Sequence, residues 1–564
     1  MKFSDFAYRR PDMALLEEQF EAWLGKLEQA DTGEAQIEAL AAINKLRGEY
    51  KTLSAIAGVR HTVDTNDPFY KAEQEFDDES QPIVQGMTTK LYEALVRSPY
   101  RGELEAKWGR QLFSLAELAL RTFSPEVMAE LQQENKLSSD YTRLIASAKI
   151  PFAGEERTLS QLVPFMQSPD REVRRQAGEA RYGFFREHEE ELDGIYDQLV
   201  KVRTSIARKL GYRNFVELGY ARMERIGYDA AMVANFRNQV KTHIVPVASK
   251  LKERQRARIG VDRIRYYDDK YLFASGNAKP KGDLDWIVDQ ATRMYDDMSP
   301  ETSAFFRFML EHELMDLASK KGKAGGGYCT YFPDYRSPYI FANFNGTTGD
   351  VDVLTHEIGH AFQMYVSRDF EVPEYYGPTL EACEIHSMSM EFFAWPWAEL
   401  FFKEDADKYR FTHLSDALLF IPYGVSVDEF QHFVYEHPEA TPAERKRAWR
   451  DIERAYLPHR QYEDNEYLER GGFWHQQGHI FNAPFYYIDY TLAQICALQF
   501  WKRAGEDRTK AWADYLHLCK LGGSLSFTEL VREAGLRSPF EDGCVESVIG
   551  HIEGSLDAID DAKL

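Results

Sequence analysis

The five residues His356-Glu357-Ile358-Gly359-His360 have the types and spacing of a metal-dependent hydrolytic site. Residues four apart lie on the same face of a helix, so both imidazoles can bind one metal ion. Glu357 then lies beside the ion without binding it, where a carboxylate can accept a proton. The pattern predicts a zinc hydrolase, although a chance match in a chain with 15 histidines has a probability of order a few per cent.

Catalytic zinc needs a third protein ligand and one open position, and a second helix predicted to begin near Thr379 offers candidates. This helix carries Glu381, Glu384, His386 and Glu391 among mostly apolar neighbours. An acid in an apolar helix is costly unless it binds a cation or forms a pair. Glu384 and Glu391 are seven residues apart and share a face. We predict Glu384 as the third zinc ligand and Glu391 as a partner that orients a ligand imidazole.

Two short strands are predicted immediately before the metal helix, in a small sheet at about residues 325–345. Aromatic and β-branched residues mark them at Tyr328–Phe332 and Pro338–Phe344, and Asn345–Gly349 has the composition of a turn. The glycines Gly325–Gly327 are interpreted as a flexible loop, with a segment that closes over a substrate as the alternative. The metal helices are expected at about residues 351–395.

Gly359 lies inside the predicted metal helix, where glycine costs about 1 kcal/mol relative to alanine. One explanation is that a neighbouring element packs closely against the helix beneath the zinc. The other is that the glycine is a tolerated change. Both stay open at this point.

The remainder of the chain has the pattern of helices. Apolar residues recur at helical spacing near the start of the chain, and N-cap residues predict helix starts at Asp12, Ser124, Ser168, Ser299 and Thr441. A chain of 564 residues is too long for one ordinary core. We predict a mainly α fold with two lobes. They are an N-terminal helical lobe at residues 1–190 and a catalytic domain at residues 191–564 that ends in a C-terminal helical wall.

The composition excludes several classes of function. The formal charge of -23 disfavours nucleic acid and anionic membranes, which bind clustered Lys and Arg. No window reaches the length of a membrane span, and the first residues do not form a signal peptide. Five cysteines without a CxxC pair predict neither a disulfide framework nor a Cys-rich zinc site. A cytoplasmic protein is expected, of unknown oligomeric state.

Four runs of residues together resemble the zinc oligopeptidase family of thimet oligopeptidase and oligoendopeptidase F. They are Asp352–Phe362, Glu384–Glu391, Leu210–Phe215 and His479–Tyr490. Within that family the chain is most similar to the short bacterial oligoendopeptidases of the Pz-peptidase type. The likeness covers the last two thirds of the chain and reaches the helical first third only in character.

The resemblance implies a two-lobed helical metallopeptidase with a deep channel that admits short unstructured peptides. It implies that an exposed strand next to the metal, placed at Tyr339–Phe344 with Ala342 and Phe344 as contacts, pairs with the peptide backbone. An ordinary sheet edge is the alternative there. It also implies that His479 and Tyr486 hydrogen-bond the scissile carbonyl.

The sequence does not uniquely assign which histidine and which tyrosine of the C-terminal segment contact the substrate. Tyr486 and Tyr490 are one helical turn apart and share a face, whereas Tyr487 points elsewhere, so Tyr490 is the further candidate for a substrate contact. His475 stays open as an alternative to His479.

We therefore predict an endopeptidase with one zinc ion per chain, in which Glu357 acts as general base toward a zinc-activated water. The resemblance suggests collagen-derived or other Pro- and Gly-containing peptides as substrates. Two alternatives stay open: a zinc hydrolase of non-peptide substrates and a peptide-binding or scaffold protein without activity. A degenerate protein of the latter kind is expected to have lost Glu357 or a ligand, and both are present.

Overall fold

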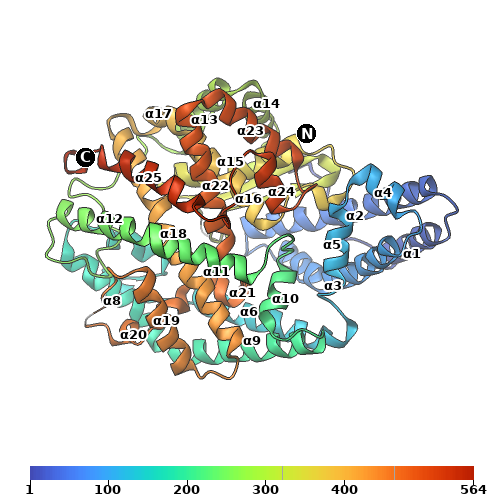
Figure 1. The fold of residues 1–564 in the computed structure, drawn as a ribbon, viewed down its shortest axis with the longest axis horizontal. Coiled ribbons are helices and arrows are strands. Elements are labelled where there is room, and N and C mark those ends of the chain that lie inside the picture. The colour runs from blue at the N-terminus through green and yellow to red at the C-terminus, as the bar shows by residue number, and fades with distance from the viewer. Residues whose placement is uncertain (321, 463) are drawn as a thin grey trace.

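The computed structural model describes residues 1–320, 322–462 and 464–564 and consists mainly of helices (Figure 1). The first helices form an arm that projects to the right in Figure 1 and is called the arm below. It comprises α1 (Met13–Glu28), α2 (Gly33–Val63), α3 (Pro68–Val96), α4 (Arg101–Trp108) and α5 (Gln111–Ala119).

The middle of the chain forms one side of the main body. Its elements are α6 (Met128–Ala146), β1 (Ile150–Phe152), β2 (Glu155–Arg157), α7 (Val163–Met166), α8 (Arg171–Glu187), α9 (Glu189–Lys209), α10 (Phe215–Arg222), α11 (Ala230–Gln239), α12 (Val245–Arg258), α13 (Leu284–Met298) and α14 (Pro300–Glu311). The long helices α6 and α9 pack against each other and run below the rest of the body in Figure 1.

The last third of the chain holds the predicted metal helices and the helices that enclose them. They are α15 (Gly349–Val366), α16 (Leu380–Phe393), α17 (Ala398–Phe402), α18 (Ala406–Glu436), α19 (Pro442–Tyr456), α20 (Glu466–Glu469), α21 (Gly478–Asn482), α22 (Tyr487–Glu506), α23 (Arg508–Leu521), α24 (Phe527–Glu533) and α25 (Cys544–Asp557). Helix α16 lies between α15 and α22 and packs extensively on both. The mainly α fold predicted from the sequence is confirmed.

A three-stranded sheet precedes α15, and both predicted strands belong to it. Its strands are β3 (Met315–Ala318), β4 (Tyr328–Phe332) and β5 (Ser337–Phe344), in the order β3-β5-β4. Strand β4 pairs antiparallel with β5, with Cys329 opposite Ile340, and β3 pairs parallel with β5. The sequence did not predict β3, a short strand whose partner lies more than twenty residues further along the chain.

Local sequence signals fix several helix starts. The side chains of Asp12, Ser299 and Thr441 accept hydrogen bonds from the first turns of α1, α14 and α19, as predicted. One predicted start is wrong: α8 begins at Arg171, and Asp170 rather than Ser168 is its N-cap. Both residues can cap a helix, and only the structure shows which one does.

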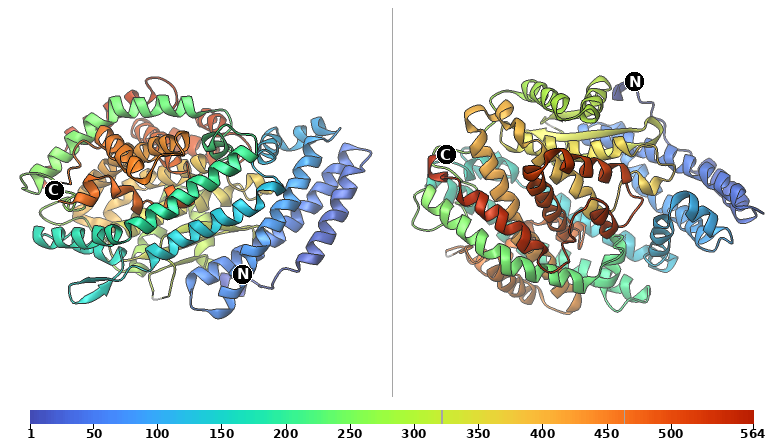
Figure 2. Two further views of the ribbon diagram at one scale, coloured as in Figure 1. Left: turned by 90° about the horizontal axis from the view of Figure 1, so that it is seen from below. Right: turned by 45° about the horizontal axis from the view of Figure 1, so that its top comes forward.

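Two groups of buried apolar side chains hold the described part of the chain together. The smaller one lies in the arm and includes Phe20, Leu40 and Leu91, whereas the larger one runs through the body. Helix α2 joins them, because its first half packs in the small group while Ile56 and Val59 belong to the large one. The two views of Figure 2 show this helix running from the arm into the body.

The end of α2 is fastened to the sheet beside the metal helix. The backbone N–H of Ala324 donates to the carbonyl of Thr62 at 2.8 Å, and the hydroxyls of Thr62 and Tyr328 lie 2.6 Å apart. The glycine segment before β4 is therefore held by the arm.

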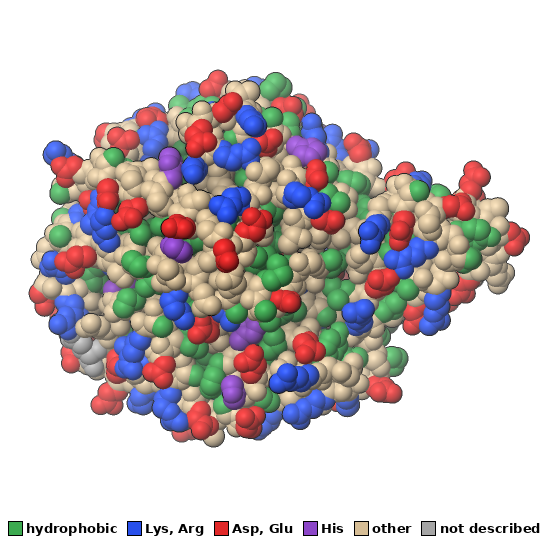
Figure 3. Space-filling model, viewed as in Figure 1, with side chains coloured by type: hydrophobic (Ala, Val, Ile, Leu, Met, Phe, Trp, Pro, Cys, Tyr) green, Lys and Arg blue, Asp and Glu red, His purple; other side chains and the backbone are tan. Residues whose placement is uncertain are grey.

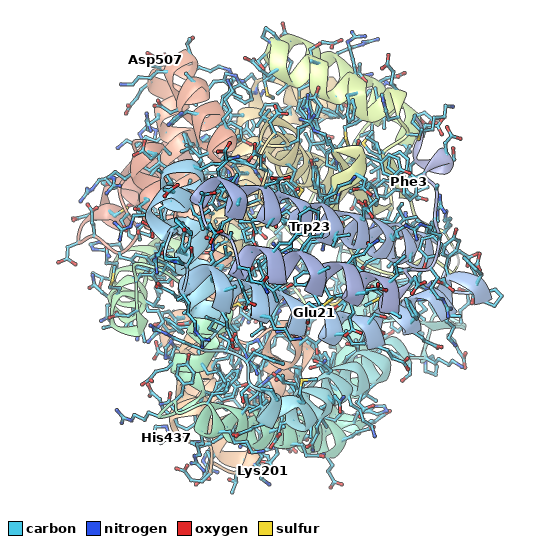
Figure 4. The ribbon with its side chains drawn as sticks, turned by 90° about the vertical axis from the view of Figure 1, so that its right-hand side faces the viewer. Phe3, Glu21, Trp23, Lys201, His437 and Asp507 are labelled. Carbon is cyan, nitrogen blue, oxygen red and sulfur yellow. The ribbon has the colours of Figure 1, made fainter. Side chains whose placement is uncertain are left out.

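The surface of the arm carries charged and aromatic side chains. Figure 4 looks onto it, with Glu21 and Trp23 of α1 toward the viewer. The Lys26 ammonium lies 3.6 Å from the centre of a Trp23 ring, and Glu21 forms an ion pair with Lys90 of α3. On the face shown in Figure 3, acidic and basic side chains are interspersed. Among the described residues, no helix has both the length and the apolar character that crossing a bilayer requires.

Candidate metal centre and active site

Helix α15 presents the His-Glu-x-x-His motif next to a tightly packed neighbour. The Asp350 carboxylate accepts hydrogen bonds from the N–H groups of Asn345 and Gly346, at 2.8 and 2.7 Å, which fixes the turn into the helix. A β-carbon at Gly359 would lie 2.6 Å from the carbonyl oxygen of His386 on α16. The structure therefore supports the first explanation for this glycine, that a neighbouring element packs closely against the helix.

The structure brings His356, His360 and Glu384 together. Glu384 Oε2 lies 3.3 Å from His356 Nε2 and 3.5 Å from His360 Nε2, and the three ligand atoms all lie within 4.8 Å of one another. A four-coordinate zinc ion with bonds of about 2.0–2.1 Å separates its ligand atoms by about 3.3–3.4 Å. Both the spacing and the donor set, two imidazoles and one carboxylate, fit zinc.

The electrostatics of the three residues also suit a cation. Burial disfavours the ionised form of Glu384, but the two imidazoles hold its pKa well below the usual range. Ser387 donates a hydrogen bond to Glu384 Oε2 at 2.9 Å and so fixes the carboxylate. A buried carboxylate that stays ionised beside two imidazoles is a site suited to a metal ion.

Glu391 lies next to His356 Nδ1, on the side of the ring that faces away from Glu384. Its Oε1 is 2.7 Å from His356 Nδ1, which leaves Nε2 of that ring facing Glu384 and His360. A carboxylate in this position fixes the orientation of a ligand imidazole. The structure therefore places Glu391 at hydrogen-bond distance from His356.

Glu357 is buried beside the two histidines. Burial raises the pKa of its carboxyl group above the usual range, against the influence of His356 and His360. A β-carbon at Gly327 would lie 3.5 Å from Glu357 Oε1, so the glycine backbone before β4 runs next to this carboxylate. An acid with a raised pKa beside a metal site is suited to proton transfer.

The C-terminal segment supplies the opposite wall of the site. The Tyr486 hydroxyl donates to Glu384 Oε1 at 2.9 Å, and the ring centres of His479 and Tyr486 are 5.7 Å apart. The Tyr490 ring lies tilted beside that of Tyr486, with ring centres 4.8 Å apart. Tyr487 packs against both His479 and Tyr490, with ring centres 4.9 and 5.6 Å away. The distant residues singled out in the sequence therefore converge on Glu384.

His475, the alternative to His479, lies away from this wall. It is fully buried, with Nδ1 2.8 Å from the Tyr467 hydroxyl and Nε2 3.0 Å from Asp193. Both of its ring nitrogens are thus occupied within the core. His479 is the histidine that shares the site with Glu384, and burial lowers its pKa.

Sequence reasoning missed the residues that present Tyr486. The preceding residue, Phe485, has a φ of +68°, a left-handed conformation that is costly for a bulky side chain. Its N–H donates to Gln431 Oε1 at 2.9 Å, and its carbonyl accepts from the fully buried guanidinium of Arg225. An aromatic residue directly before the tyrosines gives no sign of a left-handed backbone, so the sequence contained no signal for this clamp.

The strand expected to be exposed is not at the edge of the sheet. Strand β5, which contains Ala342 and Phe344, lies between β3 and β4 and is almost entirely buried. The carbonyl of Ala342 already accepts from the Lys323 ammonium at 2.5 Å. The prediction that Tyr339–Phe344 offers a free edge is therefore wrong, because β3 occupies it. Within the described sheet, β4 is the edge strand nearest Glu357.

Two hollows adjoin each other near Tyr423, and His356, Glu357, His360 and Glu384 line neither of them. One has a volume of about 490 Å³ and reaches Asp352 and His413, and the other, of about 520 Å³, reaches Gln477 and Tyr487. Tyr423 lines both and donates to Gln477 Oε1 at 2.8 Å. A further hollow of about 880 Å³ lies between β1 and α8, on a different part of the chain. Of the two adjoining hollows, the one of about 520 Å³ reaches the segment that carries His479 and Tyr486, through Gln477 and Tyr487.

Comparisons with known proteins cover nearly the whole chain. The family model described as peptidase M3 N-terminal domain matches residues 3–123, and the one described as peptidase family M3 matches residues 164–548. Oligopeptidase PepF of Bacillus subtilis (strain 168) is 21% identical over 557 residues, which span 92% of this chain and 80% of that protein.

Solved structures resemble the chain over its full length. A structure described as Pz peptidase A with inhibitor 2 is 63% identical with a TM-score of 0.96, and the match covers 100% of both chains. A putative oligoendopeptidase F from Bacillus anthracis str. Ames is 60% identical with a TM-score of 0.92, covering 100% of this chain and 99% of that one. Identities at this level accompany the same fold.

Proposed function

The chain belongs to peptidase family M3 and is a metalloendopeptidase of the oligoendopeptidase type, and we propose that His356, His360 and Glu384 hold one catalytic zinc ion per chain. The observation that carries this proposal is the spacing of 3.3 and 3.5 Å between Glu384 Oε2 and the two imidazole nitrogens. Two imidazoles and one carboxylate at this spacing would serve as the three protein ligands of a catalytic zinc ion.

When bound, zinc acts as a Lewis acid that makes water nucleophilic near neutral pH and polarises the scissile carbonyl. Glu357 accepts the proton of the attacking water at its carboxylate and delivers it to the leaving amine. The raised pKa of Glu357 supports the second of these steps, since the protonated acid forms readily. Glu391 accepts a hydrogen bond from His356 Nδ1 and so keeps the imidazole ring in its orientation.

His479 and Tyr486 donate hydrogen bonds to the carbonyl oxygen as it gains negative charge. The Gln477 amide nitrogen lies 2.8 Å from His479 Nδ1, and in this orientation its Oε1 accepts from the Tyr423 hydroxyl at 2.8 Å. An amide nitrogen is only a donor, so Nδ1 accepts and the ring proton is on Nε2, free to donate. Tyr486 has its hydroxyl at the site already, and Tyr490 beside it contacts the substrate.

The peptide backbone adds to strand β4 rather than to β5. Strand β4 is the sheet edge beside Glu357, and Gly325–Gly327 leads into it without side chains that would block the approach of a second backbone. Peptides held in this way have to be extended and unstructured. The hollow of about 520 Å³ that reaches Gln477 and Tyr487 supports substrates of limited length.

The substrate class and the compartment are further parts of the proposal. Collagen-derived or other Pro- and Gly-containing peptides are proposed because of the similarity to the structure described as a Pz peptidase. All five cysteines are free thiols, which supports a reducing compartment such as the cytoplasm.

The test combines metal analysis with peptide digestion. We expect about one zinc per purified chain, internal cleavage of short peptides in a length series followed by mass spectrometry, and loss of activity to a chelator. Glu357→Gln should keep its zinc and lose about 10²–10⁴-fold in kcat. Cleavage by this variant at the parent rate would refute the role of Glu357. Equal cleavage of decapeptides and large folded proteins would refute the restricted channel.

A further inference from the structure

We propose that His413 and Trp395 are positioning residues of the metal centre, which fix the ligand imidazole of His356 through Glu391. The proposal rests on the zinc site described above and adds two residues to it. Neither residue belongs to the His-Glu-x-x-His motif or lies next to a ligand in the sequence. They come from α18 and from the short helical turn Trp395–Trp397 that follows α16.

A continuous chain of hydrogen bonds joins these residues to the ligand. His356 Nδ1 is 2.7 Å from Glu391 Oε1, and the second oxygen, Oε2, is 2.7 Å from His413 Nε2. The indole N–H of Trp395 donates to His413 Nδ1 at 3.1 Å. Four side chains from α15, α16, α18 and the turn after α16 are thus connected in one line.

The indole N–H of Trp395, at the far end of these hydrogen bonds, determines which ring nitrogen of each histidine carries a proton. An indole N–H can only donate, so His413 Nδ1 accepts and its proton is on Nε2, directed at Glu391. Ionised Glu391 can only accept, so its Oε1 accepts a hydrogen bond from the Nδ1–H of His356. The lone pair of His356 Nε2 is then left for the metal.

The neutral form of His413 satisfies all of these hydrogen bonds. Burial disfavours a charged ring, although the bond to Glu391 raises its pKa overall. A doubly protonated ring would place an Nδ1–H against the indole N–H of Trp395. The geometry of the Trp395 bond therefore selects the neutral ring with its proton on Nε2.

Packing around His413 and Trp395 keeps these hydrogen-bonded side chains rigid. His413 is buried, and the ring of Phe392 packs edge-on against it with ring centres 4.8 Å apart. Trp395 is anchored by its own carbonyl, which accepts from the Arg410 guanidinium at 3.1 Å. Without the His413 donor, Glu391 Oε2 would lose a charge-assisted hydrogen bond and would reorient toward another partner. The ring of His356 would then lose its fixed orientation.

The test measures the zinc dissociation constant by competition with a chromophoric chelator. His413→Leu removes the donor to Glu391 and should weaken zinc binding about 10–100-fold, the usual effect of removing such an outer partner. His413→Gln keeps an amide N–H for Glu391 and an oxygen for Trp395, so it should stay within about threefold of the parent. Trp395→Phe should fall between them. The visible spectrum of the cobalt-substituted protein should shift in the same order.

His475→Leu is the matched control. It also removes a buried histidine bonded to a carboxylate, that of Asp193, but it has no link to a ligand. It should lower stability and leave zinc affinity unchanged. Parent zinc affinity in His413→Leu, or equal losses in His413→Leu and His475→Leu, would overturn the proposal. His413→Gln as weak as His413→Leu would overturn the proton assignment.

The proposed function and this inference fail in different ways. If the parent protein binds no zinc, or if His360→Ala binds it as tightly as the parent, the metal centre itself is refuted. If His360→Ala abolishes binding while the His413 and Trp395 variants bind like the parent, only the positioning role is refuted.

Discussion

Replacing Gly359 by alanine tests how tightly the metal site depends on the contact between α15 and α16. The added methyl group would lie 2.6 Å from the carbonyl oxygen of His386 and 2.6 Å from Cα of Ser387. Ordinary contact begins near 3.4 Å, about 0.8 Å further out. Both opposing atoms are backbone, so no flexible side chain can move out of the way and the helices must separate.

The displacement acts directly on the third ligand. Ser387 donates to Glu384 Oε2 at 2.9 Å, so a shift of the α16 backbone at Ser387 moves this carboxylate relative to His356 and His360. Metal sites tolerate deviations of about 0.2 Å, well below the required separation. We expect zinc affinity to fall about 10–100-fold, equivalent to about 1.4–2.8 kcal/mol. Overpacking costs about 1–3 kcal/mol of stability, less the gain of about 1 kcal/mol in helix propensity.

The assay compares zinc affinity and urea unfolding in Gly359→Ala and in Gly550→Ala. Gly550 lies exposed in α25 with nothing within 4 Å of the added methyl, so alanine there should raise stability by up to about 1 kcal/mol. Its zinc affinity should equal that of the parent. If Gly359→Ala gains stability like Gly550→Ala and binds zinc like the parent, the two helix backbones are not rigidly packed and the reasoning is wrong.

Four further substitutions test other parts of the structure. Tyr486→Phe should lower kcat about 10²–10³-fold in steady-state assays with a quenched peptide, because one donor to the carbonyl oxygen is lost. Gln431→Leu should lower kcat with little change in KM, because the N–H of Phe485 loses its acceptor. Lys323→Met should lower the free energy of unfolding in urea by about 2–4 kcal/mol. Loss of the buried ammonium leaves one carboxylate and three carbonyls without their donor. Burial raises the pKa of Asp352 to about 7, so the folded protein holds a proton that the unfolded chain releases. The unfolding free energy should therefore fall as pH rises from about 4 to about 7, and Asp352→Asn should flatten that fall.

Each of these has an outcome that contradicts it. Loss of zinc in Tyr486→Phe would assign its hydroxyl a structural role at the metal site rather than a role in turnover. Parent kcat in Gln431→Leu would mean that Phe485 holds its conformation without the clamp. Lys323→Met as stable as the parent would show that its acceptors find water, and an unchanged pH slope in Asp352→Asn would show that this residue does not titrate in the range.

The sequence determined those features that depend on local spacing. Two histidines four residues apart on a helix must share a face, and an acid in an apolar helix needs a cation, so His356, His360 and Glu384 could be predicted from residue types and spacing alone. Capping residues fixed several helix starts for the same reason, because their partners lie within one turn. Glu391 followed from its face of the second helix.

Only the tertiary structure decided contacts between residues far apart in the chain. A strand's composition does not reveal how many neighbours it has, so nothing in the sequence of β5 indicates that β3 covers its edge. His475 and His479 differ in the partners that surround each ring. Asp193, the partner of His475, lies almost three hundred residues away from it in the sequence. The same holds for His413, whose proton is fixed by an indole and a carboxylate from other elements. Helical periodicity places side chains on a face, whereas the partner that the face meets is set by packing of the whole chain.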